Sequence, residues 1–312
     1  MEYTTTVAAI KPITITIGNF DGVHLGHQRL MRQLCATAQQ LNSKPVLVTF
    51  SPHTLMIVRP DIDVRYLTTL EEKLALTKIY GNIADNVVIN FTPAVAAMSA
   101  NDFMFSLATH FSIKGMVIGA NFSLGHNRMG DVTFLQQYGQ KHNIVVLPIP
   151  LEEAETTRIS STRIRALVSD GQISEANELL GHPLTLSDIV KRGEQRGRLL
   201  GFPTANLHPE THKLLPADGV YAVRTSINDV ISDAASPSPV YNGVVNIGVR
   251  PTFNEKEHIV EVHLLDVQPD LYDKRITIDF IARLRSEQRF ANIDALKSQI
   301  AADVQQARQI LK

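Results

Sequence analysis

The stretch that decides the fold is TITIGNFDGVHLGHQRLM, residues 14–31. It opens with an alternating β-branched run that predicts a buried strand. A turn with Gly18 and Gly22 follows, and a helical pattern starts near His24 and His27. Glycines at such a corner let backbone N–H groups approach a ligand, and a helix N-terminus attracts negative charge. The corner therefore predicts a site for a small anion.

The composition is that of an ordinary globular protein large enough for two domains. The chain has 312 residues, 44% hydrophobic and 20% charged, with a net charge of −1. This balance lacks the surplus positive charge that non-specific nucleic-acid binding requires. The single cysteine, Cys35, suits a reducing cytosol. With no recognisable signal peptide or membrane-spanning run, we expect a cytoplasmic protein.

The first half alternates strands and helices. Strands are predicted at 13–17, 45–50, 86–91, 115–119 and 144–149, and helices at 27–41, 69–80, 99–111 and 131–142. The strands are apolar on both faces, which is typical of a parallel sheet covered by helices. We therefore expect a Rossmann-like α/β domain over residues 1–183, with its ligands at the carboxyl ends of the strands.

The pattern changes in the second half. Two short helices are expected within 159–184, and four strand-like segments follow at 219–227, 240–248, 258–266 and 274–285. A helix is predicted only at the end, over 292–311. Residues 184–312 are therefore predicted to form a small antiparallel β-barrel with a C-terminal helix.

The residues alone leave the role of the histidine corner open. Neither a G-x-x-x-x-G-K-[ST] loop nor a G-x-G-x-x-G turn follows the first strand, so two common phosphate fingerprints are excluded. Two histidines three apart could be half of a metal site, although no nearby ligand completes it. They could equally be structural or solvent-facing, or they could face one anion pocket.

A second cluster, GRLLGFPTANL, occupies residues 197–207. Thr204 and Asn206 lie two apart, so in an extended segment they point to one side. A hydroxyl and an amide oxygen suit Mg²⁺ and phosphate. Standing alone, however, such a segment is more often a turn.

Taken in order, the motifs resemble one family. GNFDGVHLGHQ is similar to the H-x-G-H nucleotidyltransferases, and TFSPH (49–53), YLTTLEEK (66–73), GANFSLG (119–125) and ISSTRIR (159–165) follow as in the bacterial bifunctional riboflavin kinase/FAD synthetases. PTAN, LLPADGVYAV, GVVNIGVRPTF and VEVHLLD then follow as in riboflavin kinases. The resemblance covers nearly the whole chain. It implies a six-stranded barrel for the second domain.

For the first domain, the resemblance implies adenylyl transfer, in which the phosphate of FMN attacks the α-phosphorus of ATP and pyrophosphate leaves. A phosphate nucleophile is already ionised, so the site needs positioning and charge stabilisation rather than a base. His24 and His27 are expected to hold the ATP phosphates. Further ATP or phosphate contacts are implied for Gly18, Asn19, Phe20, Gly22, Asn121, Ser160, Ser161, Thr162 and Arg165.

One position departs from the family pattern F-x-F-G. Leu124 stands where an aromatic side chain is expected to stack on the flavin ring. Because leucine packs without a π face, the loss is about 1 kcal/mol. We expect weaker flavin binding at Leu124 rather than an inactive site.

For the second domain, the resemblance implies phosphoryl transfer from ATP to the 5′-hydroxyl of riboflavin. An alcohol is a poor nucleophile, so a positioned carboxylate is useful, and Glu261 matches the general base. Arg285 is a looser match to a residue near flavin or phosphate. ATP contacts are implied for Gly197, Gly201, Pro203, Thr204 and Asn206, with Mg²⁺ at the last two.

The sequence thus predicts a bifunctional enzyme that converts riboflavin to FMN and FMN to FAD, with ATP and Mg²⁺ in both reactions. Two alternatives stay open. Leu124 prompts a riboflavin kinase with weak or lost adenylylation, and the third possibility is a flavin-binding regulator without turnover. The oligomeric state is not predicted.

Overall fold

The computed structural model describes residues 1–7, 11–150, 153–154, 157–192, 201–228, 239–251 and 256–312. The chain forms two compact units, Met1–Ser161 and Thr162–Lys312. The break lies earlier than residue 183, so two short helices group with the second unit. The boundary expected after residue 183 stays a prediction.

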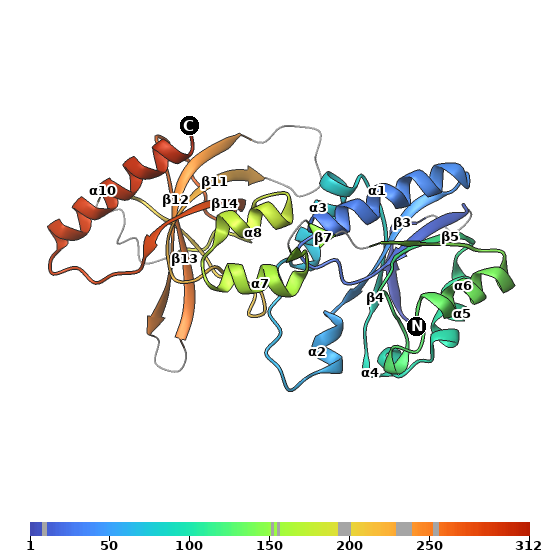
Figure 1. The fold of residues 1–312 in the computed structure, drawn as a ribbon. Coiled ribbons are helices and arrows are strands. Elements are labelled where there is room, and N and C mark those ends of the chain that lie inside the picture. The colour runs from blue at the N-terminus through green and yellow to red at the C-terminus, as the bar shows by residue number, and fades with distance from the viewer. Residues whose placement is uncertain (8–10, 151–152, 155–156, 193–200, 229–238, 252–255) are drawn as a thin grey trace. The chain divides into compact units, whose positions relative to one another are not determined.

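The first unit is built on a six-stranded sheet in the order β1-β4-β3-β2-β5-β6. Figure 1 labels β3, β4 and β5 of this sheet. Strands β2 to β6 are parallel, and β1 pairs antiparallel with β4 at the edge. The strands are β1 Tyr3–Thr5, β2 Ile13–Ile17, β3 Lys44–Ser51, β4 Asp85–Asn90, β5 Ile113–Gly119 and β6 Val145–Ile149. A two-stranded hairpin follows, β7 Glu153–Ala154 with β8 Thr157–Arg158.

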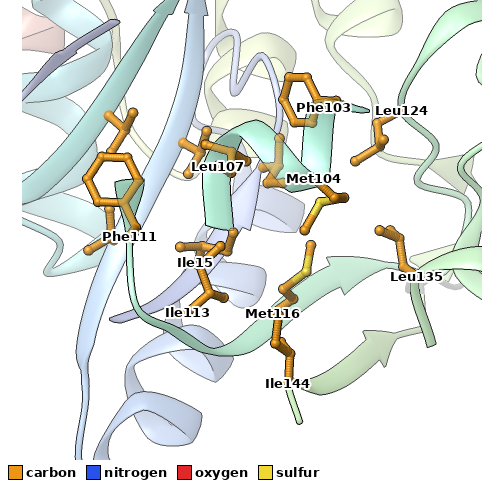
Figure 2. Packing of buried hydrophobic residues seen from close by; sticks show 14 of the residues in the cluster. Ile15, Phe103, Met104, Leu107, Phe111, Ile113, Met116, Leu124, Leu135 and Ile144 are labelled. Carbon is orange, nitrogen blue, oxygen red and sulfur yellow. The ribbon is translucent and has the colours of Figure 1, made fainter. Parts of the chain in front are cut away.

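Helices cover both faces of this sheet because alternate strand residues point to opposite sides. The helices are α1 Leu25–Gln40, α2 Thr54–Val58, α3 Leu70–Gly81, α4 Pro93–Ala96, α5 Ala100–His110, the short η1 His126–Arg128 and α6 Val132–His142. Met116 packs with α5 and α6 on one face, in the core that Figure 2 shows. Its neighbour Val117 packs with Met31 of α1 and Leu76 of α3 on the other. The expected covered parallel sheet is confirmed.

The strand order places the predicted corner where ligands bind in such sheets. The connections run outward in opposite directions from β2 and β5, which lie side by side. Loops after two such strands diverge and leave a crevice at their carboxyl ends. The histidine corner follows β2, and the GANFSLG segment follows β5.

The second unit is an antiparallel six-stranded sheet in the order β10-β13-β12-β11-β14-β9. The strands are β9 Leu184–Ile189, β10 Ala205–Leu207, β11 Gly219–Asn228, β12 Val240–Pro251, β13 Lys256–Leu264 and β14 Arg275–Ser286. Its two edges approach at one bridge, where the Lys191 N–H donates to the Asn206 carbonyl over 2.9 Å. The six-stranded antiparallel architecture predicted as a barrel is confirmed, and the sheet curls into a half-barrel.

Three helices accompany the half-barrel: α7 Ser161–Ser169, α8 Ile173–Leu180 and α10 Ile293–Ile310. The inner face of the sheet buries Tyr221 and Phe280, which pack edge to face. Val304 and Ala307 of α10 pack with Val220 of β11 on the outer face. Among the described residues, no helix is both long and apolar enough to cross a membrane.

Candidate active sites

The histidine corner begins α1 as its sequence requires. His24 is the N-cap, and its Nδ1 accepts the His27 backbone N–H over 3.4 Å. The two imidazole rings stack with centroids 3.6 Å apart and planes 16° from parallel. A Cβ at Gly26 would lie 3.2 Å from the His24 ring, so glycine leaves room for the stack.

The turn before α1 has an unusual backbone. The φ values of Phe20, Gly22 and Val23 are 50°, 79° and 42°. They lie in the left-handed region that residues other than glycine rarely adopt. The Gly22 N–H donates to Thr68 Oγ1 over 3.1 Å. Residues 20–23 therefore hold a strained turn with support from the loop before α3, as functional corners often do.

The surroundings of His27 favour its neutral form. Burial, the adjacent His24 and the charge of Lys73, in that order, hold the pKa of His27 well below its usual 6.5. A metal site here would need further ligands, and no group of three His, Cys, Asp or Glu side chains among the described residues could hold an ion. The geometry favours two hydrogen-bonding rings over a metal site.

A cavity of about 1140 Å³ opens at this corner. Nine residues predicted for the first site line it: Gly18, Asn19, Phe20, His24, His27, Asn121, Leu124, Ser160 and Ser161. Gly22 is not among the lining residues, and its N–H donates to Thr68 Oγ1. The cavity exceeds the usual range for one small ligand, so two can meet there.

The charge of the lining suits anions. It contains three arginines, Arg29, Arg32 and Arg128, and three histidines, and none of its described residues is a carboxylate. Sequence reasoning missed Arg29 and Arg32. Their spacing from Leu25 at i+4 and i+7 on one helix face was the available signal.

Aromatic side chains form another part of the lining. Phe50, Phe91, Phe103 and Phe122 line the cavity, and the Phe50 ring lies 5.3 Å from Phe91 and 6.3 Å from Phe103 between centroids. Leu124 is 8% exposed and packs into the same core as Phe103 (Figure 2). These phenylalanines come from separate elements, so no local pattern reveals them.

The ISSTRIR segment crosses the break between the units. Ser161 Oγ donates to the carbonyl of Asp21 over 2.9 Å, which ties the start of α7 to the corner turn. Thr162 and Arg165 belong to the second unit, where Arg165 Nη2 donates to Thr162 Oγ1 over 3.4 Å. Their roles with pyrophosphate stay predictions.

The second site is organised by strand register. Asn206 of β10 and Asn246 of β12 are both cross-strand partners of Glu261 in β13. Directly opposed residues share one face of a sheet, so the carboxylate has an amide side chain on either side. Val260 and Val262 point to the inner core, as the expected alternation requires. Asn246 was missed because pairing between distant strands leaves no local pattern.

The loop leading into β10 carries the other predicted residues. Thr204 is half-buried next to the strand, and the Pro203 carbonyl is hydrogen-bonded to His263 Nδ1 at 2.9 Å. Gly201 has φ 89°, which glycine adopts without strain. Gly197 lies outside the described residues. A cavity of about 620 Å³ is lined by Gly201, Phe202, His263 and residues of α10, among others.

Arg285 lies on the same outer face but points to α10. Its guanidinium makes three contacts of 2.8–3.0 Å with the carboxylate of Asp303, which is 4% exposed. The register row places Val220 and Asn246 between Arg285 and Glu261, a distance of three strand spacings, or about 14 Å. Contact of Arg285 with flavin stays a prediction.

Comparison with known proteins identifies the families that the two parts of the chain resemble. Residues 7–163 match the family model for FAD synthetase, and residues 180–311 match that for riboflavin kinase. The bifunctional riboflavin kinase/FMN adenylyltransferase of Escherichia coli K12 is 38% identical over 95% of this chain and 91% of its own. That of Pseudomonas fluorescens is 36% identical over 94% and 91%.

A solved structure has a similar fold over nearly the whole chain. A crystal structure from Streptococcus pneumoniae, described as a macrolide-efflux protein, matches 97% of this chain and 96% of its own at 28% identity, with a TM-score of 0.85. These matches confirm the resemblance drawn from the motifs. The chain belongs to the family of bifunctional riboflavin kinase/FMN adenylyltransferases.

Proposed function

We propose that the second unit phosphorylates riboflavin to FMN, and that the first unit adenylylates FMN to FAD, each with ATP. The contrast between the two sites carries this proposal. The first is a cavity lined by cations without a described carboxylate, whereas the second presents Glu261 between two amide side chains. That difference matches a nucleophile that is already ionised and one that must lose a proton.

In adenylyl transfer, the protein's task is to bring two anions together. His24 and His27 offer ring N–H groups to the ATP phosphates, and Arg29 and Arg32 offset the charge that gathers on the leaving pyrophosphate. Thr162 and Arg165 are proposed to close over that product. Fixing the two reactants removes most of the entropic barrier to their reaction.

For the flavin ring, we propose that it packs against the phenylalanine part of the lining. Leu124 contributes apolar contact only at the edge of this surface, since most of its side chain is in the core. The weaker stacking expected at Leu124 is then partly offset by Phe50, Phe91 and Phe103.

In phosphoryl transfer, Glu261 accepts the proton of the ribityl 5′-hydroxyl as that oxygen attacks the γ-phosphorus of ATP, whose bond to the bridging oxygen breaks and releases ADP. Asn206, 7% exposed, and Asn246 lie opposite Glu261 on the neighbouring strands, within reach to position its carboxylate. A positioned base of this kind contributes about 10²- to 10⁴-fold in rate.

Magnesium fits the donors of the second site. The hydroxyl of Thr204 and the amide oxygen of Asn206 are hard, neutral ligands that leave positions on the ion for phosphate oxygens and water. When bound, Mg²⁺ neutralises charge on the phosphates of ATP. A cytoplasmic location, where ATP and a reduced Cys35 are both expected, accords with this activity.

The test supplies riboflavin as the only flavin, with ATP and Mg²⁺, and follows products by chromatography. FMN followed by FAD is expected. Accumulation of FMN alone would leave only the kinase, and unchanged riboflavin would indicate a binding protein.

Two variants separate the sites. Glu261→Ala should abolish FMN formation and spare adenylylation of supplied FMN, whereas His27→Ala should do the reverse. Loss of both activities in either folded variant would contradict the assignment of one reaction to each unit.

A further inference from the structure

Lys73 is a buried charge close to the first site but outside its lining. It lies in the first turn of α3 and is 6% exposed. Its Nζ donates to Thr49 Oγ1 over 3.0 Å and to the Phe50 carbonyl over 3.4 Å. Burial lowers the pKa of Lys73 to about 8, while nearby Asp21 opposes that shift. Because a buried ammonium is costly, its retention calls for a reason.

A hydrogen-bond relay connects Lys73 to the cavity. Thr49 Oγ1 accepts from the ammonium and donates over 3.3 Å to the carbonyl of Asn19, a lining residue. A hydroxyl has one proton, and an ammonium can only donate. Lys73 therefore directs the Thr49 proton toward Asn19 and fixes the start of the corner turn.

The rest of the turn is held by residues just before Lys73. Asp21 Oδ1 accepts from the backbone N–H and hydroxyl of Thr68 over 3.1 and 3.3 Å. The Gly22 N–H donates to the same hydroxyl. The segment from Thr68 to Lys73 thus braces both sides of a turn with left-handed residues.

The charge of Lys73 also affects the pKa of His27. Its charge, with that of His24, disfavours protonation of His27, which burial already opposes. Asp21 is the carboxylate that interacts with this ammonium, and Arg29 and Arg32 are cations of α1 that line the cavity. A neutral His27 carries one ring N–H that can donate to a phosphate oxygen, and its other ring nitrogen is an acceptor.

We infer that Lys73 is a positioning residue for adenylyl transfer, which sets the corner turn through Thr49 and Asn19. The inference rests on the proposed adenylylation in the first unit. Lys73 touches no substrate in this scheme, so its loss should alter geometry and proton affinity rather than remove a contact.

The test compares Lys73→Met, Lys73→Arg and Lys78→Met, the last an exposed lysine on the same helix. Lys73→Met should lower kcat for FAD formation by about 10²-fold, the cost of a small misplacement at a reacting centre. Lys73→Arg should recover most of that rate, and Lys78→Met should match the wild type. The rate of FMN formation, in the other unit, should be the same in all four proteins.

A second readout is the titration of His27 by nuclear magnetic resonance. Lys73→Met should raise its pKa toward the ordinary value, because a repelling charge is gone, and Lys78→Met should leave it unchanged. Thr49→Val removes only the relay, so it should slow FAD formation without raising that pKa, whereas Thr49→Ser should keep the rate. The Thr49 pair also tests the inference if Lys73→Met does not fold by circular dichroism.

The outcomes distinguish a failure of the proposed adenylylation from a failure of the role inferred for Lys73. A wild-type protein that forms FMN but no FAD would overturn the proposed adenylylation itself. Wild-type rates of FAD formation in Lys73→Met, or in Thr49→Val, would overturn the inference alone.

Discussion

The ion pairs Arg285–Asp303 and Arg308–Asp266 attach α10 to the half-barrel, and they differ in burial and in the number of contacts. Arg285 and Asp303 make three contacts of 2.8–3.0 Å, with side chains 20% and 4% exposed. Arg308 and Asp266 make one contact of 2.6 Å, with side chains 43% and 72% exposed. The same change, Asp to Asn, can therefore be made at Asp303 in the more buried pair and at Asp266 in the more exposed pair. Each pair includes one residue of α10.

The expected magnitudes follow from that difference. Asp303→Asn leaves the Arg285 guanidinium with one acceptor oxygen and turns an amide donor toward it. Breaking a buried pair costs about 3–5 kcal/mol, and partial exposure of Arg285 places this case near 3. Asp266→Asn should cost less than about 1 kcal/mol. Asp266 has φ 62°, which asparagine also adopts, so backbone strain does not confuse the control.

Amide hydrogen exchange of α10 measures the free energy of opening in each protein. Asp303→Asn should lower this free energy by about three times as much as Asp266→Asn. The rate of riboflavin phosphorylation should fall in Asp303→Asn as well, because α10 lines the cavity next to Gly201. Equal losses in the two variants would refute the view that burial sets the strength of these pairs.

Further predictions concern the first unit and the turns. Because the pKa of His27 is depressed, unfolding takes up a proton below about pH 6.5, so stability should fall by up to about 1.4 kcal/mol per pH unit there. His27→Gln should show a shallower slope in hydrogen exchange of the first unit, and parallel slopes would contradict the assignment. Gly125→Ala should destabilise that unit by at least 2 kcal/mol or so in thermal unfolding, since φ is 75° and the new Cβ would lie 2.6 Å from the Ala100 nitrogen. Gly201→Ala, with φ 89° and open space around it, should cost only about 1 kcal/mol, and a larger loss would show an unrecognised contact.

The architecture followed well from periodicity. The predicted strand 13–17 is β2 without change, and the helix predicted at 69–80 is α3 within one residue at each end. The helix predicted at 27–41 begins two residues earlier because His24 acts as its N-cap, a role usually taken by Ser, Thr, Asp or Asn. The short elements α2, α4, β9 and β10 were missed, since a few residues give too little periodicity to separate them from loops.

The sites were predictable where chemistry is local in sequence. The corner turn and PTAN were found because their residues lie within a few positions of one another. Asn246, Phe103 and Lys73 were not, because strand register, helix packing and buried hydrogen bonds bring them in from distant segments. Their contribution is visible only in three dimensions.

The lining of the first cavity has a consequence for work in solution. Three guanidinium groups in that lining, which contains no described carboxylate, attract any compact polyanion, and three imidazoles add hydrogen-bonding groups. Sulfate or inorganic phosphate in a buffer will compete with nucleotide there, and the released pyrophosphate will rebind until another enzyme hydrolyses it. Turnover in the test tube will then depend on the choice of salt as much as on the concentration of flavin.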